Sequence, residues 1–212
     1  IDDLKKSYLD RSLVILKECD PSLECLGAFY SGPCPVLHVR RNDQEYIFKL
    51  AITSFDNEMI PNEARILSDL KDVNGITHLV ERYGKKSEVR AILKEFFPGN
   101  CLEDQEKISD QLLQEKLIDT VRQIHGVGYT CLDLHEGNIV ITKDQKEICF
   151  VDPIQDTTRL SPKNQRNKDR DLLHLVMLFS QCYSLNVILS IVQHFIITFL
   201  MNNKQQKNNQ NN

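Results

Sequence analysis

The stretch CLDLHEGNIVI at residues 131–141 decides the fold, because it sets several polar side chains directly before an apolar run. Asp133 is followed at the fifth position by Asn138, and Asn138 begins the run NIVI. A short loop that enters a strand can hold the Asp133 carboxylate forward while it turns the amide oxygen of Asn138 toward a metal ion. The stretch therefore predicts a loop that carries chemistry, followed by a strand.

A hairpin after this loop would bring a second carboxylate to the same place. Asp152 stands fourteen residues beyond Asn138, at the end of the apolar run ICFV. If NIVI and ICFV pair around the polar turn TKDQKE, Asn138 and Asp152 return to one edge, where they can share a cation. An aspartate and an asparagine at this spacing occur by chance in many loops, so the interpretation depends on the rest of the chain.

The composition is that of a globular protein rather than a disordered one. The 212 residues are 41% hydrophobic, which is enough to bury a core. The formal net charge is −4 and no long block of lysine or arginine is present, so the composition gives no nucleic-acid signal. The 7 cysteines form no C-x-x-C pair, which argues against a disulfide framework and a zinc site. A reducing, cytoplasmic setting is expected.

In the first half of the chain, the hydrophobic pattern predicts a helix, a small antiparallel sheet and a second helix. The first helix covers about residues 2–18, and short apolar stretches between turn residues predict strands within residues 23–51. The second helix, about twelve residues long, lies within residues 57–73, where Pro61 suits a first helical turn. Strands that return the chain to the sheet are expected at residues 76–84 and 89–97.

The second half is predicted to be mostly helical. An apolar stripe predicts a helix over residues 105–125, the two strands of the hairpin follow, and helical segments extend from about residue 169 to 201. Residues 184–200 are largely apolar, and we interpret them as a buried helix rather than a membrane span because polar residues interrupt them. The Asn- and Gln-rich tail at residues 201–212 is expected to be disordered.

Segregation of strands and helices along the chain predicts an α+β fold with two lobes and a cleft between them. The N-lobe, at about residues 1–97, would hold the small antiparallel sheet. The C-lobe, at about residues 98–200, would be mostly helical and shortened. Residues 1–200 would then form a single domain.

The run IHGVGYTCLDLHEGNIVI, eight residues and then FVD resembles the catalytic loop and metal-binding strand of the protein-kinase superfamily. The signature of that family is H-R-D-L-x-x-x-N followed by D-F-G. The resemblance implies a two-lobed protein-kinase-like fold in which Asp133 is the catalytic aspartate. It also implies that Asn138 and Asp152 bind magnesium, with ATP and Mg²⁺ as cofactors.

Upstream, the same resemblance implies a lysine on the third strand and a glutamate in the next helix. Lys49 in EYIFKLA and Glu63 in PNEARILSDL occupy these positions, with Glu58 as a weaker alternative to Glu63. A lysine on a buried strand is costly unless it is paired, so an ion pair gives a physical reason for both residues, and Lys49 would contact the phosphates. AILKEFFPGN resembles the hinge, where the backbone around Glu95 and Phe97 would bind adenine.

The chain departs from the family pattern at several positions. Gly27 and Gly32 in CLGAFYSGPCPVLHV are the expected phosphate-loop glycines, but two prolines there remove amide donors that a phosphate would use. Leu132 stands where the family has an arginine, so a phosphorylated activation loop would have no docking cation. Lys94 falls just before the hinge, where an apolar residue is usual, and the sequence offers no reason for it.

The segment after the hairpin is short, since seventeen residues run from Pro153 to Asp169 and no Ala-Pro-Glu element is present. Asp169 or Asp171 is expected to brace the catalytic loop, with an ordinary helix N-terminal carboxylate as the alternative. These features resemble the compact atypical kinases: the RIO kinases, the small kinase subunit of the KEOPS complex and the lipopolysaccharide-type kinases. The D-L-H-x-G-N spelling is also similar to that of aminoglycoside and choline phosphotransferases.

The favoured hypothesis is an ATP- and Mg²⁺-dependent phosphotransferase, an atypical Ser/Thr protein kinase that also phosphorylates itself. Two alternatives stay open. One is a kinase for a small molecule or a sugar, and the other is a nucleotide-binding pseudokinase or ATPase switch that serves a regulatory protein partner. The expected partners are a nucleotide and a protein or small-molecule hydroxyl acceptor, and no membrane span is expected.

Overall fold

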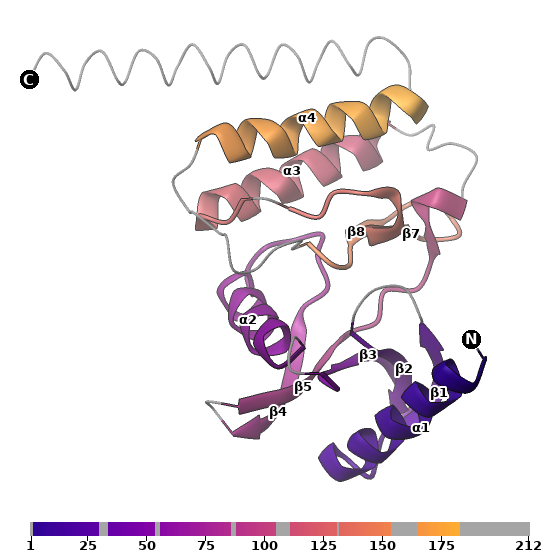
Figure 1. Ribbon diagram of the computed structural model, residues 1–212. Coiled ribbons are helices and arrows are strands. Elements are labelled where there is room, and N and C mark those ends of the chain that lie inside the picture. Colours follow the sequence, from indigo (N-terminus) through magenta and orange to yellow (C-terminus); the bar gives the residue numbers. More distant parts are fainter. Residues whose placement is uncertain are drawn as a thin grey trace, which may run out of the picture. The chain divides into compact units, whose positions relative to one another are not determined.

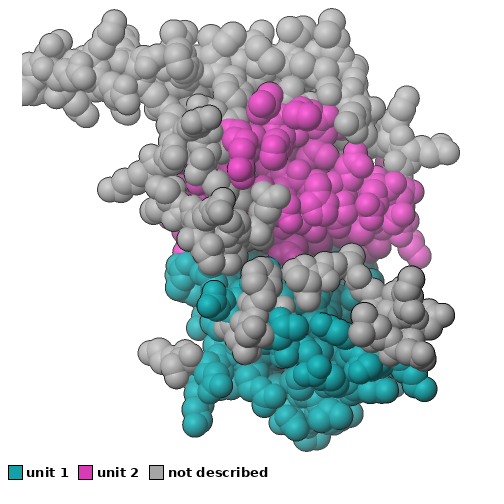
Figure 2. All heavy atoms as spheres, in the orientation of Figure 1, with its two compact units in different colours: residues 1–98 teal, residues 99–212 magenta. Residues whose placement is uncertain are grey.

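The chain divides into two compact units, Ile1–Pro98 and Gly99–Asn212, which are coloured separately in Figure 2. The computed structural model describes residues 2–29, 34–53, 56–85, 88–104, 111–130, 132–153 and 165–182. Gly32, the apolar segment 184–200 and the tail 201–212 lie outside the described residues.

Unit 1 is built on a five-stranded antiparallel sheet, with the strand order β1-β2-β3-β5-β4 (Figure 1). The strands are β1 (Glu24–Phe29), β2 (Val36–Arg41), β3 (Gln44–Leu50), β4 (Leu79–Lys85) and β5 (Glu88–Glu95). Each was expected from the sequence to within a few residues. The small antiparallel sheet is therefore confirmed.

A two-residue turn fixes the register of β2 and β3. Arg41 pairs with Gln44, and the turn residues Asn42 and Asp43 have φ angles of 52° and 62°. Asparagine and aspartate adopt this left-handed conformation more readily than other residues with a Cβ, and a turn with positive φ at both central positions matches the twist of a hairpin. This register places Lys49 opposite Val36.

A helix packs on each face of the sheet. On one face, α1 (Asp2–Cys19) buries Leu16 in a cluster that includes Phe48 of β3 and Leu93 of β5. On the other, α2 (Asp56–Asp69) buries side chains against Ile92 of β5. Successive residues of a strand point to opposite faces, so Lys49 and Lys94, which neighbour Phe48 and Leu93, belong to the α2 face.

Pro61 lies inside α2 rather than in its first turn, so its predicted position was wrong. The helix begins at Asp56, and Pro61 therefore cannot donate the backbone hydrogen bond that would reach the carbonyl of Asn57. Helical structure continues because Ile60, Ala64 and Leu67 are buried against the sheet in one cluster, and this apolar burial offsets the lost hydrogen bond.

A polar network ties the end of α1 to the sheet. Asp20 accepts hydrogen bonds from the Ser22 amide (2.9 Å) and hydroxyl (2.6 Å) and from Arg41 Nη1 (2.9 Å), and Arg41 Nη1 also contacts Glu81 at 2.9 Å. Tyr83 donates its hydroxyl to Asp20 (3.3 Å) and to Glu81 (3.1 Å). Burial raises the pKa of Asp20, but these Ser22 and Arg41 donors outweigh it and leave the pKa below its ordinary value.

Asp20→Asn should lower the free energy of unfolding at neutral pH by about 1 kcal/mol. The folded-state pKa of Asp20 is depressed, so its contribution is present above the unfolded-state pKa and is lost as the pH falls through the folded-state pKa. Urea unfolding of wild type and variant at descending pH measures this. The two stabilities should converge in acid, and a difference that stays constant with pH would contradict the expectation.

Within its described residues, unit 2 combines a three-stranded sheet, in the order β6-β7-β8, with two helices (Figure 1). The strands are β6 (Asn100–Cys101), β7 (Ile139–Ile141) and β8 (Ile148–Phe150), the helices are α3 (Gln111–Val127) and α4 (Gln165–Cys182), and the 3-10 turns are η1 (Leu102–Asp104) and η2 (Glu136–Asn138). The predicted hairpin is confirmed, because Ile139 pairs with Phe150 and Ile141 with Ile148.

The short strand β6 is not among the predicted strands, since the sequence predicts a strand over residues 89–97 and none directly after it. Asn100 pairs with Ile141 of β7. A side chain at Gly99 would collide with the backbone carbonyl of Ile141, so only glycine permits this close approach. Gly99 therefore allows β6 to pair with β7.

The described part of α3 begins at Gln111 rather than at residue 105, and residues 105–110 lie outside the described residues. Its buried stripe contains Leu113, Leu117, Val121 and Ile124. The helix ends where Gly128 adopts a φ of 106° and donates its amide to the Ile124 carbonyl at 3.2 Å, a left-handed terminus of the expected kind.

The α+β fold class is confirmed, with a sheet-based first unit and a second unit whose main elements are α3 and α4. Within the described residues, no helix combines the length and the apolar character that crossing a membrane requires. The predicted helix beyond Cys182 falls outside the described residues.

Candidate functional site

In unit 1, the central feature is a buried carboxylate between two lysines. Lys49 Nζ of β3 lies 2.7 Å from Glu63 Oε2 of α2, and Lys94 Nζ of β5 lies 2.8 Å from Glu63 Oε1. The three side chains are 10%, 4% and 7% exposed for Lys49, Lys94 and Glu63 respectively. The structure therefore pairs Lys49 with Glu63, while the alternative Glu58 is exposed.

The register of the sheet explains how both lysines reach one glutamate. Lys49 lies opposite Ile92, and Lys94 is two residues further along β5, opposite Ile47. Residues two apart on a strand share a face, so Ile92 and Lys94 both face α2. Glu63 belongs to the same helix as Ala64 and Leu67, which pack on that face. The sheet therefore presents two ammonium groups to the one carboxylate.

In the expected hinge around Glu95 and Phe97, part of the backbone already forms hydrogen bonds within unit 1. The Glu95 amide donates to the His78 carbonyl at 3.0 Å, and the Glu95 carboxylate accepts from the His78 amide at 3.1 Å. Phe96 stacks on His38 of β2, with ring centroids 4.3 Å apart. Phe97 is half-buried. The Glu95 amide is therefore not open to an adenine, which restricts the predicted hinge contacts to other backbone groups of the segment.

Gly27 lies in β1, next to an irregularity in the pairing with β2. A Cβ built at Gly27 would meet nothing within 4 Å. The fold itself therefore does not require glycine at this position. Gly32, the other predicted phosphate-loop glycine, lies outside the described residues.

In unit 2, backbone hydrogen bonds shape the loop that carries Asp133. The Asp133 amide donates to the Pro153 carbonyl at 3.3 Å, and the Asp133 carbonyl accepts from the His135 amide at 3.0 Å. Leu132 is fully buried, whereas the Asp133 side chain is 28% exposed. The buried neighbour anchors the loop while the Asp133 carboxylate remains accessible.

Asn138 joins the loop to the end of the hairpin. Its Nδ2 donates to the Asp133 carbonyl at 3.1 Å and to the Asp152 carbonyl at 3.2 Å. The Asn138 carbonyl also accepts from the Val151 amide at 2.9 Å. Because both side-chain partners are carbonyl acceptors, the NH₂ group must face them. The amide oxygen of Asn138 is thereby directed away from Asp133 and Asp152 main chains and is suited to bind a cation.

The hairpin brings together the three unit 2 residues that the sequence singled out. Asp133 and Asp152 are both held by the Asn138 side chain through their main-chain carbonyls. Asp152 is half-buried and follows β8 by two residues. The carboxylate of Asp152 and the amide oxygen of Asn138 are ligand types that Mg²⁺ prefers, and the structure places these two residues on adjoining segments.

His135 has an oriented ring beside Asp133. Its Nδ1 accepts a hydrogen bond from the Gly137 amide at 3.1 Å. In a neutral ring the proton then resides on Nε2, which lies 3.6 Å from Asp133 Oδ2. The His135 Nε2 therefore lies near the Asp133 carboxylate, just beyond hydrogen-bond distance.

Asp171 of α4 braces the loop that carries Asp133 by contacting its backbone. Its Oδ1 accepts from the Leu132 amide at 3.0 Å, and its Oδ2 lies 3.0 Å from His125 Nε2 of α3. Asp171 is fully buried and His125 nearly so. The expectation that one of two aspartates braces the loop is confirmed for Asp171, and the side chain of Asp169 is outside the described residues.

A cavity of about 370 Å³ lies beside the loop within unit 2. Its polar wall comes from Glu103, His135, Glu136 and His174, and its apolar wall includes Leu134 and Met177. One of its lining residues, His135, has its Nε2 3.6 Å from Asp133 Oδ2, although Asp133 itself does not line the cavity. Its size suits a small organic molecule or a side chain.

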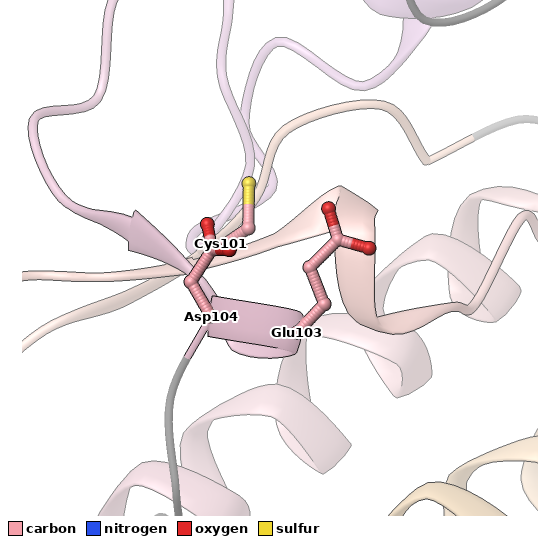
Figure 3. Close-up of side chains that lie close together, drawn as sticks. All are labelled: Cys101, Glu103 and Asp104. Carbon is pink, nitrogen blue, oxygen red and sulfur yellow. The ribbon is translucent and has the colours of Figure 1, made fainter.

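Cys101, Glu103 and Asp104 also lie close together, with one potential ligand atom from each within 4.8 Å of the others (Figure 3). Burial, followed by the charges of Glu103 and Asp104, raises the pKa of the Cys101 thiol. Its Sγ donates to the Gly137 carbonyl at 3.4 Å. A protonated, hydrogen-bonded thiol is not the thiolate that a metal binds, so this group is not by itself a metal site.

Sequence reasoning missed the partner of Lys94 and the role of His125. A lysine directly after the apolar run AIL was the available signal for Lys94, because a buried lysine requires a partner. His125 ends an apolar helical stripe and gave no comparable signal.

Comparison with known proteins supports the fold. The chain matches none of the protein-family models and none of the curated proteins. Among solved structures, it is similar to the Cydia pomonella granulovirus kinase PK-1, with a TM-score of 0.57 and 11% sequence identity. The match covers 79% of this chain and 70% of the granulovirus chain. The chain therefore has a protein-kinase-like fold.

Proposed function

We propose that this chain is an ATP- and Mg²⁺-dependent phosphotransferase, a minimal atypical relative of the protein kinases that acts on Ser or Thr hydroxyls, its own included. The observation that carries the proposal is the loop and hairpin of unit 2, where Asn138 holds the main chains of Asp133 and Asp152 together. The kinase-like fold supports the same reading.

Unit 1 supplies the cation that the proposal requires for the phosphates. Lys49 is held by Glu63 on a buried sheet face, and a positioned ammonium group can neutralise charge on the α- and β-phosphates of a nucleotide. The segment around Phe97 remains the proposed adenine contact. Gly27 and Gly32 remain the proposed phosphate-loop glycines.

Unit 2 supplies oxygen ligands and an acceptor-orienting carboxylate. Bound Mg²⁺ would neutralise negative charge on the phosphoryl group during transfer. The amide oxygen of Asn138 and the carboxylate of Asp152 are the proposed ligands. Asp133, whose carboxylate lies 3.6 Å from His135 Nε2, would accept a hydrogen bond from the acceptor hydroxyl and orient it.

A small molecule is the second candidate acceptor, and the 370 Å³ cavity beside His135 favours it. Its two glutamates and two histidines would suit a hydroxyl compound that also carries amino groups. A screen of amino alcohols and sugars against generic protein acceptors separates the two candidates. Faster transfer to a metabolite would replace the protein-kinase assignment.

Lys49→Met should weaken Mg-ATP binding about ten-fold, equivalent to about 1.4 kcal/mol. The variant should still fold, because Glu63 keeps its contact with Lys94 at 2.8 Å. The shift of the melting temperature with increasing Mg-ATP measures the affinity of each protein. Lys85→Met is the matched control, since Lys85 is an exposed lysine of the same sheet.

Two outcomes of this titration would contradict the proposal. If Mg-ATP leaves the melting temperature of the wild type unchanged, the nucleotide-dependent function is wrong. If Lys49→Met and Lys85→Met bind equally well, Lys49 does not contact the phosphates. Binding by the wild type without transfer would instead favour a nucleotide-dependent switch that serves a protein partner.

A further inference from the structure

Lys94 gives the buried glutamate of unit 1 a second cation. Each oxygen of the Glu63 carboxylate has its own lysine, since Oε1 lies 2.8 Å from Lys94 and Oε2 lies 2.7 Å from Lys49. The two contacts therefore do not compete for one oxygen. Either lysine can leave while the carboxylate keeps the other.

The two lysines are not equivalent in their surroundings. Lys94 is 4% exposed and Lys49 is 10% exposed. Lys94 also belongs to β5, the strand whose Ile92 packs with Ala64 and Leu67 of α2 in one buried cluster. The Lys94 contact thus spans a packed helix-strand interface, which restricts its movement.

A further contact anchors α2 to this side of the sheet. Arg82 of β4 donates to the Ala64 carbonyl at 2.9 Å and also to the Ser68 hydroxyl. Ala64 follows Glu63 directly, so the backbone that carries the carboxylate is fixed beside the Lys94 contact. The glutamate is held from β4 and β5 independently of Lys49.

We propose that Lys94 is the fixed counter-ion of Glu63 and that Lys49 is the exchangeable one. Removing the last partner of a buried charge carries a large cost in stability. With Lys94 in place, Lys49 can leave Glu63 without exposing the protein to that cost. Lys94 is accordingly a positioning residue, which acts on Lys49 through Glu63.

The inference rests on the proposed function in one respect only, namely which group the Lys49 ammonium contacts after it leaves Glu63. In a phosphotransferase, Lys49 would be released toward the phosphates of the bound nucleotide while Glu63 stays paired. This role would explain why Lys94 stands just before the hinge, where an apolar residue is usual. It keeps the α2 carboxylate neutralised during each exchange.

Chemical labelling of lysines tests this without any nucleotide. The full chain is treated briefly with an amine-reactive reagent, and mass spectrometry follows the modification rates of Lys49 and Lys94. In the wild type, Lys49 should react faster than Lys94. In Lys94→Met, the rate at Lys49 should fall by at least about ten-fold, because release of Lys49 would then leave Glu63 without either lysine.

The direction of the change separates positioning from simple support of the fold. If Lys94 only supported packing, its loss would loosen the sheet, and Lys49 would react faster in Lys94→Met. An increased or unchanged rate at Lys49 would therefore overturn the inference. Lys94→Arg keeps a cation beside Glu63, so its Lys49 rate should fall less than that of Lys94→Met.

A wild-type comparison keeps the inference testable if Lys94→Met does not fold, which its melting curve would reveal. Equal or faster labelling of Lys94 than of Lys49 would overturn the proposal by itself. The failure of the proposed function is separate from these results. If Mg-ATP does not bind, the phosphotransferase is wrong, whereas the labelling rates still decide whether Lys94 is the fixed partner.

Discussion

Replacing Asp133 by asparagine should reduce phosphoryl transfer by about 100- to 10,000-fold, the range expected for loss of a positioned proton acceptor. The loop should keep its shape, because the Asn138 side chain and the His135 amide donate their hydrogen bonds to the main-chain carbonyl of Asp133, which the substitution leaves in place. Transfer of label from γ-labelled ATP to a protein acceptor, with melting curves recorded in parallel, measures both expectations.

Glu147→Gln is the matched control, since Glu147 is an exposed carboxylate just before β8 in the same unit. It should transfer label at the wild-type rate. Equal rates for the wild type and Asp133→Asn would rule out Asp133 as the group that orients the acceptor. A large fall in the melting temperature of Asp133→Asn would show that its loss of activity came from unfolding.

Asp171→Ala should lower the free energy of unfolding by roughly 2–4 kcal/mol, because it strips partners from two buried donors that each cost about 1–3 kcal/mol when unsatisfied. These are the Leu132 amide and, in the protonated or Nε2-H form, the ring of His125. Urea unfolding of the full chain, followed by a signal from unit 2, measures the loss.

Asp119→Ala provides the comparison, because Asp119 is an exposed carboxylate on α3, and its loss should change stability by no more than about 0.5 kcal/mol. Asp171→Asn should recover part of the stability, since its amide oxygen can still accept from Leu132. If Asp171→Ala were as stable as Asp119→Ala, α4 would not brace the loop that carries Asp133.

The sequence predicted those parts of the site that depend on local spacing. Asn138 and Asp152 converge because a hairpin with a short polar turn leaves little freedom in its register. Lys49 and Glu63 were also found together, since a strand lysine and a following helix glutamate belong to the pattern of the resemblance. In these places, sequence distance and spatial contact are closely linked.

Other features depend on contacts between elements that are distant in sequence. The Lys94 contact with Glu63 spans 31 residues and requires both the register of β5 and the rotation of α2. The spacing in the sequence could not show which of Asp169 and Asp171 braces the loop. That choice depends on which side of α4 faces His125 of α3. The position of Pro61 was misjudged because apolar packing outweighs the preference of proline for a first turn.

The most direct test of the proposed activity is label transfer by the purified wild-type chain. The chain is incubated with γ-labelled ATP and Mg²⁺ in the presence of protein and small-molecule hydroxyl acceptors. The account predicts covalent label on the chain or on an acceptor, lost on chelation of Mg²⁺ and in Asp133→Asn. No transfer by the wild type to any acceptor, or transfer that persists unchanged in Asp133→Asn, would contradict it.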